Sequence, residues 1–116
     1  MALKQELMSS SAPSALADRL GLDPIVAVAA AGTTQVTATD LTANCWDVTS
    51  GAGGVQINSF EQIQFGVNNS GAAVTVYPPA NGTINGGAAN AGISLPNLKS
   101  IFLIPNGLNL MAIVSA

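Results

Sequence analysis

The chain has 116 residues, with three basic and six acidic side chains, no histidine, one cysteine and twelve glycines. This length supports one hydrophobic core, so we expect a single folded domain. A net charge of -3 leaves no basic surface for nucleic acid or an anionic membrane, and we expect neither as a partner. Without histidine the chain lacks the commonest proton-transfer group and metal ligand, so we expect no enzyme activity, metal or cofactor.

Charged side chains make up 8% of the chain, against about 25% in ordinary soluble domains. Five of the nine lie in the first 24 residues. A free monomer with so few ionic groups has little to keep its surface hydrated and its strand edges unpaired. We therefore expect a subunit of an assembly. The alternative is a neutral domain whose surface is solvated by Asn, Ser, Thr and Gly.

Residues 1–24 are expected to form an N-terminal arm with short helices. Leu3 and Leu7 stand four positions apart, as do Leu16 and Leu20, so each pair makes a small apolar stripe on a helix. Helices this short become ordered only when they dock onto a surface. The four leucines are our candidate anchors on a partner; in the alternative, the arm packs on its own domain or on a sister subunit.

From Ile25 onward, apolar residues alternate with polar ones and turn residues recur at short intervals. This pattern predicts a β domain over residues 25–116, with eight or so short strands and no helix between them. The fold class expected is all-β, a small antiparallel β-sandwich or barrel that is jelly-roll-like.

Several clusters mark the expected turns. Residues 51–54 and 68–71 are rich in Gly, Asn and Ser. Three Asn-Gly dipeptides, Asn81-Gly82, Asn85-Gly86 and Asn106-Gly107, are typical of tight hairpins. Pro78 and Pro79 cannot donate hydrogen bonds to a sheet, so Tyr77 is expected to end a strand or to lie at an edge.

The C-terminal strands are apolar on both faces. Ile101, Phe102, Leu103 and Ile104 follow one another and cannot all point into one core. One side is therefore expected to meet a neighbouring subunit. The alternative is a central strand covered on both faces by its own chain.

We find no catalytic constellation in the sequence. The glycines at 51–54 lack the Lys-Ser or Lys-Thr pair of a phosphate loop and are expected to form a turn. Asp40, Asp47 and Glu61 have no evident acid, base or cation beside them and are expected to be solvated. Cys45 has no histidine partner, which excludes a cysteine–histidine nucleophile.

The run from Val74 to Gly86, VTVYPPANGTING, followed by Ala89-Asn90-Ala91 and Ser94-Leu95, resembles a pattern of small virion proteins of tailed bacteriophages, of the head decoration or cement type. The resemblance covers roughly residues 32–104 and leaves out the arm. Members of the group commonly carry an aromatic pair near the end, where this chain has Leu110 and Met111.

The resemblance implies a compact β domain that forms a homotrimer on the outer surface of a capsid. It implies the major capsid protein as partner, synthesis in the host cytoplasm, and no reaction or cofactor. Six residues of the matched motif are carried over as structural positions only: Tyr77, Pro78, Pro79, Ile84, Asn85 and Asn90.

The resulting hypothesis is a structural protein that stabilises a capsid by binding across the junctions between capsomers. Weak contacts from several arms would combine into tight attachment through their high effective concentration. One alternative is a fibre or tail-associated module that recognises glycans, for which the five aromatic residues offer little exposed platform. Another is a tail or head-completion component with six- or twelve-fold symmetry.

Overall fold

Ten β-strands and no helix make up the part of the chain that the computed structural model describes, residues 25–116. This confirms the all-β prediction. The strands are β1 (Val26–Ala29), β2 (Thr39–Asp40), β3 (Cys45–Ser50), β4 (Gly53–Gln56), β5 (Gln64–Asn68), β6 (Val74–Tyr77), β7 (Thr83–Ile84), β8 (Ile93–Leu95), β9 (Ser100–Asn106) and β10 (Asn109–Val114).

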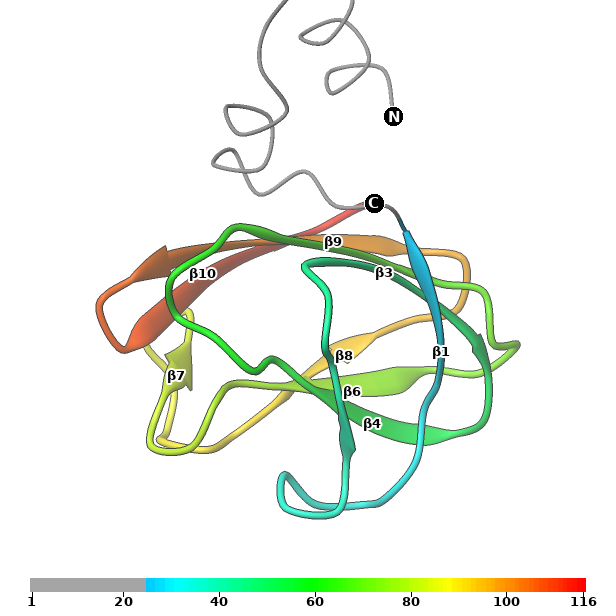
Figure 1. Ribbon diagram of the computed structural model, residues 1–116, viewed down its shortest axis with the longest axis horizontal. Helices are drawn as coiled ribbons and strands as arrows, with labels where there is room; N and C mark the ends of the chain where they lie inside the picture. Colours follow the sequence, from blue (N-terminus) through cyan, green and yellow to red (C-terminus); the bar gives the residue numbers. More distant parts are fainter. Residues whose placement is uncertain (1–24) are drawn as a thin grey trace, which may run out of the picture.

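The strands form two sheets that face each other across a hydrophobic core (Figure 1). The larger one, sheet A, has the order β1-β3-β5-β9-β10-β7, and the smaller one, sheet B, has the order β2-β4-β6-β8. From β1 to β9 the chain alternates between the sheets, so odd-numbered strands lie in sheet A and even-numbered ones in sheet B.

The first six strands form a coil of three turns, and each turn has one strand in sheet A and one in sheet B. β1, β3 and β5 are parallel neighbours in sheet A, and β2, β4 and β6 are parallel neighbours in sheet B. In sheet A, Val26 pairs with Trp46 and Trp46 with Gly66, so each turn advances the sequence by 20 residues. The coil therefore repeats its backbone path without an obvious sequence repeat.

The last four strands end the coil by reversing direction. β8 pairs antiparallel with β6 in sheet B, and β9 pairs antiparallel with β5 in sheet A. β10 then forms a hairpin with β9, while its other edge holds β7 in parallel. One end of the sandwich therefore carries three further strands of sheet A, which are β9, β10 and β7. At the other end, β1 and β2 are the edge strands.

The expected antiparallel, jelly-roll-like sandwich is wrong in its strand directions. Among the strand pairs of residues 25–116, five are parallel and three antiparallel. The turn residues were located well, but most of these turns connect opposite sheets. Residues 51–54 lead from β3 in sheet A to β4 in sheet B, and Gly53 and Gly54 already belong to β4.

Of the three Asn-Gly dipeptides, only one lies in the hairpin that was predicted for it. Asn106-Gly107 joins β9 to β10 as the predicted hairpin. Asn81-Gly82 and Asn85-Gly86 instead lie on either side of β7, which pairs with the distant β10. Asn85 and Gly86 both have positive φ, at 53° and 71°, so the conformational preference was correct although the hairpin was not.

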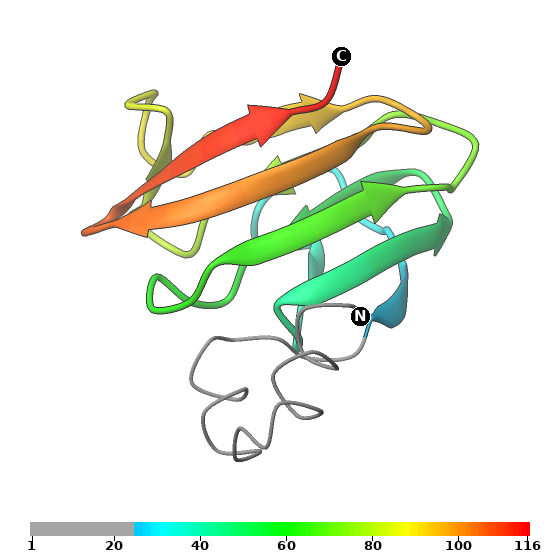
Figure 2. The same ribbon diagram turned by 90° about the horizontal axis from the view of Figure 1, so that it is seen from above.

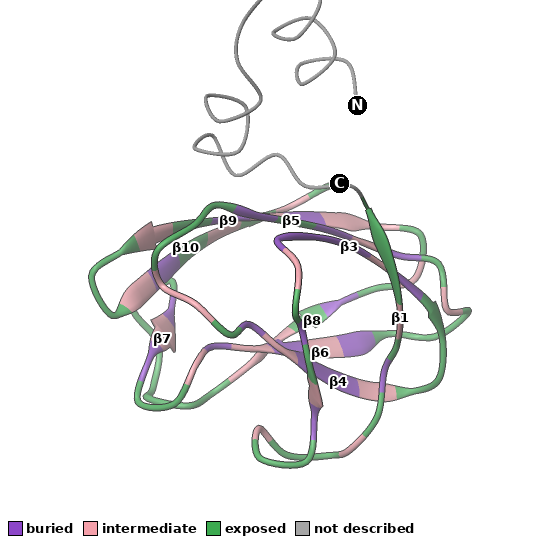
Figure 3. Cartoon of the chain, in the orientation of Figure 1, coloured by how far each residue is buried: buried purple, intermediate pink, exposed green. Residues whose placement is uncertain are grey.

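Trp46 is the largest side chain of the core and is 1% exposed. Its pairing partner on β5 is Gly66, and a Cβ atom added to Gly66 would lie 2.3 Å from Cη2 of the indole. The ring therefore occupies the space that a side chain at position 66 would fill. Around it, the buried residues gather between the sheets (Figure 3), including Leu41, Val55, Val76, Leu95, Leu103 and Leu110.

We predict that Gly66→Ala destabilises the domain by about 1–3 kcal/mol, because the added methyl group overpacks the core against Trp46. Urea unfolding followed by far-UV circular dichroism measures the loss. Gly87→Ala is the matched control, since its nearest neighbour would be the Ile84 carbonyl oxygen at 3.2 Å. Equal stability of the two variants would contradict the packing described here.

Candidate docking surfaces

The six motif residues lie in two places, and all of them serve the fold. Tyr77 is the last residue of β6, as the two prolines predicted. Its hydroxyl donates a hydrogen bond to the carbonyl of Thr33 at 3.2 Å. The carbonyl of Pro78 accepts hydrogen bonds from Gln35 Nε2 at 2.7 Å and Gln56 Nε2 at 3.4 Å. This corner thereby ties the loop after β1 to the ends of β4 and β6; Pro79, the residue that follows, is partly buried.

The other motif residues hold β7 and the loop that follows it. Ile84 is buried in the core. The side-chain amide of Asn85 pairs with the backbone of Ala112 in the way that a neighbouring strand would. Its Oδ1 accepts a hydrogen bond from the Ala112 amide at 2.8 Å, and its Nδ2 donates one to the Ala112 carbonyl at 3.2 Å. Asn90 Oδ1 accepts from the Asn81 amide at 2.6 Å. These contacts give the motif residues of this segment structural roles in the sheet and its loop.

The candidate anchors Leu3, Leu7, Leu16 and Leu20 lie outside the described residues, as do the expected short helices of the arm. The surfaces that the structure offers for docking are therefore those of the β domain.

The outer face of sheet A, which is seen from outside in Figure 2, carries exposed apolar residues on neighbouring strands. We call it the apolar face and define it by six residues of β5, β9, β10 and the position before β5: Ile63, Phe65, Phe102, Ile104, Met111 and Ile113. Met111 is 50% and Ile113 65% exposed. Single exposed apolar residues are ordinary, but a contiguous set points to an interaction site.

Strand register groups these residues into two rows. Phe65 pairs with Phe102, and Phe102 with Ile113, so three large side chains cross three strands in one line. The rings of Phe65 and Phe102 meet edge to face, with centroids 6.2 Å apart. Ile104 pairs with Met111, and the register of β5 and β9 places Ile63 next in that row.

The C-terminal strands have one apolar face that residues 25–116 leave exposed, and the neighbouring subunit expected on that face stays a prediction. In β9, Ile101 and Leu103 are buried between the sheets, whereas Phe102 is partly exposed and Ile104 exposed. β9 is central in sheet A, yet no second layer of residues 25–116 covers its outer side. The alternative of a strand covered on both faces by its own chain does not hold for the described residues.

Charged groups are dispersed over the domain. Asp47 on β3 accepts a hydrogen bond from Asn69 Nδ2 at 2.9 Å, and the Lys99 ammonium donates to the backbone oxygen of Ala116. Asp40 and Glu61 are exposed. Among residues 25–116, no three His, Cys, Asp or Glu side chains lie close enough to hold a metal ion. The same stretch contains no helix that could cross a bilayer.

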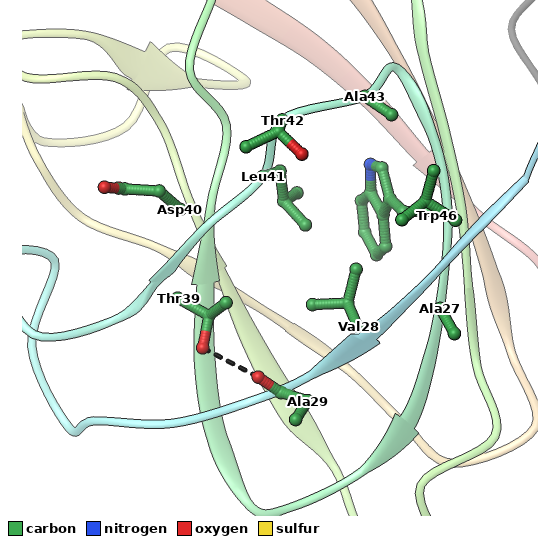
Figure 4. Close-up of a pocket in the computed structure, with 10 residues that line it drawn as sticks. Ala27, Val28, Ala29, Thr39, Asp40, Leu41, Thr42, Ala43 and Trp46 are labelled. Carbon is green, nitrogen blue, oxygen red and sulfur yellow. Dashed lines mark hydrogen bonds between the residues drawn. The ribbon is translucent and has the colours of Figure 1, made fainter.

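A groove of about 270 Å³ lies at the end of the sandwich where β1 and β2 are the edge strands. We call it the terminal groove; it is lined by residues 26–29, residues 39–43 and Trp46 (Figure 4). Thr39 Oγ1 donates to the Ala29 carbonyl at 2.7 Å and bridges the two walls. The indole Nε1 of Trp46 is buried and has no hydrogen-bond acceptor in the described structure. Sequence reasoning missed this groove, because it depends on how the first turn of the coil ends.

No protein-family model, curated protein or solved structure matches the chain.

We predict that Asn85→Ala lowers the free energy of unfolding by about 1–2 kcal/mol, since two hydrogen bonds to Ala112 are lost. Urea denaturation with an unchanged m value would report the change as stability alone. Asn81→Ala is the matched control, since Asn81 is also exposed and has a positive φ of 68°. If both variants unfold at the same urea concentration, Asn85 does not hold β10.

Proposed function

We propose that this protein is a structural subunit of a bacteriophage virion, which decorates the capsid as a homo-oligomer bound across capsomer junctions. The observation that carries the proposal is the apolar face, which residues 25–116 leave uncovered and in which no charged side chain takes part. The resemblance of residues 32–104 to decoration proteins supplies the biological setting and the expectation of a trimer.

We assign the apolar face to contacts between copies of the chain. Interfaces of permanent homo-oligomers are more apolar than the rest of the surface and are depleted of charged residues at their centre. The apolar face has this composition, with two aromatic rings and four aliphatic or methionine side chains. A protein that is synthesised before it reaches its capsid would keep such a face covered by its own copies.

The second contact in the proposal joins the oligomer to the capsid, through the arm. Leu3, Leu7, Leu16 and Leu20 are the anchors that the sequence suggests. In a trimer three arms act together, so contacts that are weak one at a time give tight binding. A protein attached across a junction must detach before the capsomers separate, and its binding free energy therefore stabilises the shell.

The first test concerns the oligomer. We expect the full chain to sediment as a trimer, and Ile113→Asp to sediment as a monomer, because it places a charge within the apolar face. Val36→Asp is the matched control, since Val36 is 89% exposed and lies on the loop after β1, away from that face. A wild-type chain that is monomeric at micromolar concentration would contradict the assignment, as would a trimer that tolerates Ile113→Asp.

The second test concerns attachment. Capsids of the encoding phage, prepared without this protein, are mixed with the purified chain and collected by sedimentation. We expect the double variant Leu3→Ser/Leu7→Ser to remain oligomeric but to bind at least about 100-fold more weakly, since each weakened arm contact is multiplied by avidity. Val36→Ser, whose oligomer and arm are intact, should bind like the wild type. Unchanged binding by the double variant would remove these leucines from the anchor.

A further inference from the structure

The dipeptide Asn-Gly occurs three times in the chain, and the structure places its copies in three different environments. The backbone nitrogen that follows an asparagine can attack the carboxamide carbon of that side chain. Glycine favours the attack, because it has no Cβ atom to obstruct the approach and its backbone turns freely. Whether a copy reacts in the folded protein therefore depends on how firmly the carboxamide and the glycine nitrogen are held.

In Asn85-Gly86 both reacting groups are held. The Asn85 carboxamide makes hydrogen bonds of 2.8 and 3.2 Å with the Ala112 backbone. The Gly86 amide donates a hydrogen bond to Asn109 Oδ1 at 3.0 Å. Three hydrogen bonds must therefore break before the Gly86 nitrogen reaches the Asn85 carboxamide, and the fold protects this copy.

In Asn81-Gly82 the attacking nitrogen is held. Gly82 is buried, and its amide donates a hydrogen bond to the Pro79 carbonyl at 2.9 Å. A Cβ atom added to Gly82 would lie 2.4 Å from Cζ of Phe60, so the phenyl ring packs against this backbone. Asn81 is exposed, but the Gly82 nitrogen cannot turn towards its side chain without leaving Pro79 and displacing Phe60.

In Asn106-Gly107 neither group is held within residues 25–116. Both residues are exposed, and neither the Asn106 side chain nor the Gly107 amide makes a hydrogen bond within this range. A Cβ atom added to Gly107 would meet nothing within 4 Å, so the backbone has open space around it. Asn106 pairs with Asn109 at the end of the β9–β10 hairpin, and only this terminal pair has to open for the two groups to meet.

We propose that Asn106 is a site of covalent self-modification, a deamidation whose only co-reactant is water. The Gly107 nitrogen forms a bond to Cγ of Asn106 and gives up its proton. The bond from Cγ to Nδ2 breaks, and Nδ2 leaves with that proton as ammonia, so the product is a cyclic succinimide. Water then adds to one carbonyl of the ring and opens it, which leaves either aspartate or isoaspartate at position 106. No atom is oxidised or reduced.

The modification changes the rim of the apolar face. Asn106 follows Ile104 by two positions in β9, so both side chains lie on the same side of sheet A. Each event adds one carboxylate to a chain whose net charge is -3. Isoaspartate also lengthens the main chain beside a turn made only of Gly107 and Leu108, which weakens the pairing of β9 with β10. This inference concerns the isolated chain and stands without the proposed capsid role.

Trypsin separates Asn106 from the other two copies of the dipeptide, because it cleaves after Arg19 and Lys99. Residues 100–116 then carry Asn106, and residues 20–99 carry the other two copies. The full-length protein is aged in mildly alkaline buffer, with and without urea, and digested at intervals. Mass spectrometry with fragmentation then measures the replacement of the side-chain NH2 by OH at each position.

Each hydrogen bond that must break in the folded protein slows the reaction about fivefold. We expect Asn106 to react within about fivefold of its rate in urea that unfolds the chain. Asn85 should react about 100-fold more slowly than Asn106 in the folded protein, with Asn81 between them. In urea the three copies should react at similar rates, because they share the dipeptide and have lost the contacts that distinguish them.

Asn106→Gln is the matched control, because its ring closes through one more carbon and far more slowly. It should abolish the mass gain in residues 100–116, whereas a reaction at Asn109 would leave that gain in place. Equal rates at Asn85 and Asn106 in the folded protein would overturn the proposal. An Asn106 that reacts more than about tenfold more slowly in the folded protein than in urea would also overturn it, because the hairpin would then protect the site.

Discussion

The fit of Trp46 against Gly66 is the contact on which the sandwich depends. In sheet A a parallel coil brings each strand beside the strand 20 residues later, and this register lays the largest side chain of the core on a residue that has none. A shift of one residue in the pairing of β3 would turn Trp46 out of the core. The residue paired with Gly66 would then be a different one. The same contact sets Trp46 as a wall of the terminal groove, so the register also shapes that end of the domain.

Period-two alternation was sufficient to predict the all-β class and most strand positions, because it reports which face of a strand is buried. It carries no information on the direction of the neighbouring strand, and the predicted antiparallel sandwich was wrong for this reason. A signal for the coil did exist in the 20-residue spacing of Val26, Trp46 and Gly66. These residues differ too much in size to be recognised as a repeat, and the two that pack tightly together, Trp46 and Gly66, are complementary in size.

The candidate surfaces, like the fold, could be predicted from the sequence only in part. Four consecutive apolar residues, Ile101 to Ile104, were enough to predict a strand with an apolar outer side. Their partners Phe65, Met111 and Ile113 come from other strands and are joined to them only by register. Asn85 was expected at a structural position, but its pairing with Ala112, 27 residues away, depends on β7 lying beside β10. The terminal groove lies where β1 and β2 are the edge strands among residues 25–116, and no local pattern encodes which strands lie at an edge.

The position of β7 has a consequence for how the chain is made. A ribosome delivers the strands in order, and the parallel turns of the coil can add to one another as each emerges. Thr83 and Ile84 must wait for Asn109 and Leu110, and the core gains Ile101, Leu103 and Leu110 only with the last strands. Contacts between distant segments are slow to form. The nascent domain therefore keeps its apolar interior open until β10 has been made, and the apolar surface exposed during that interval favours aggregation.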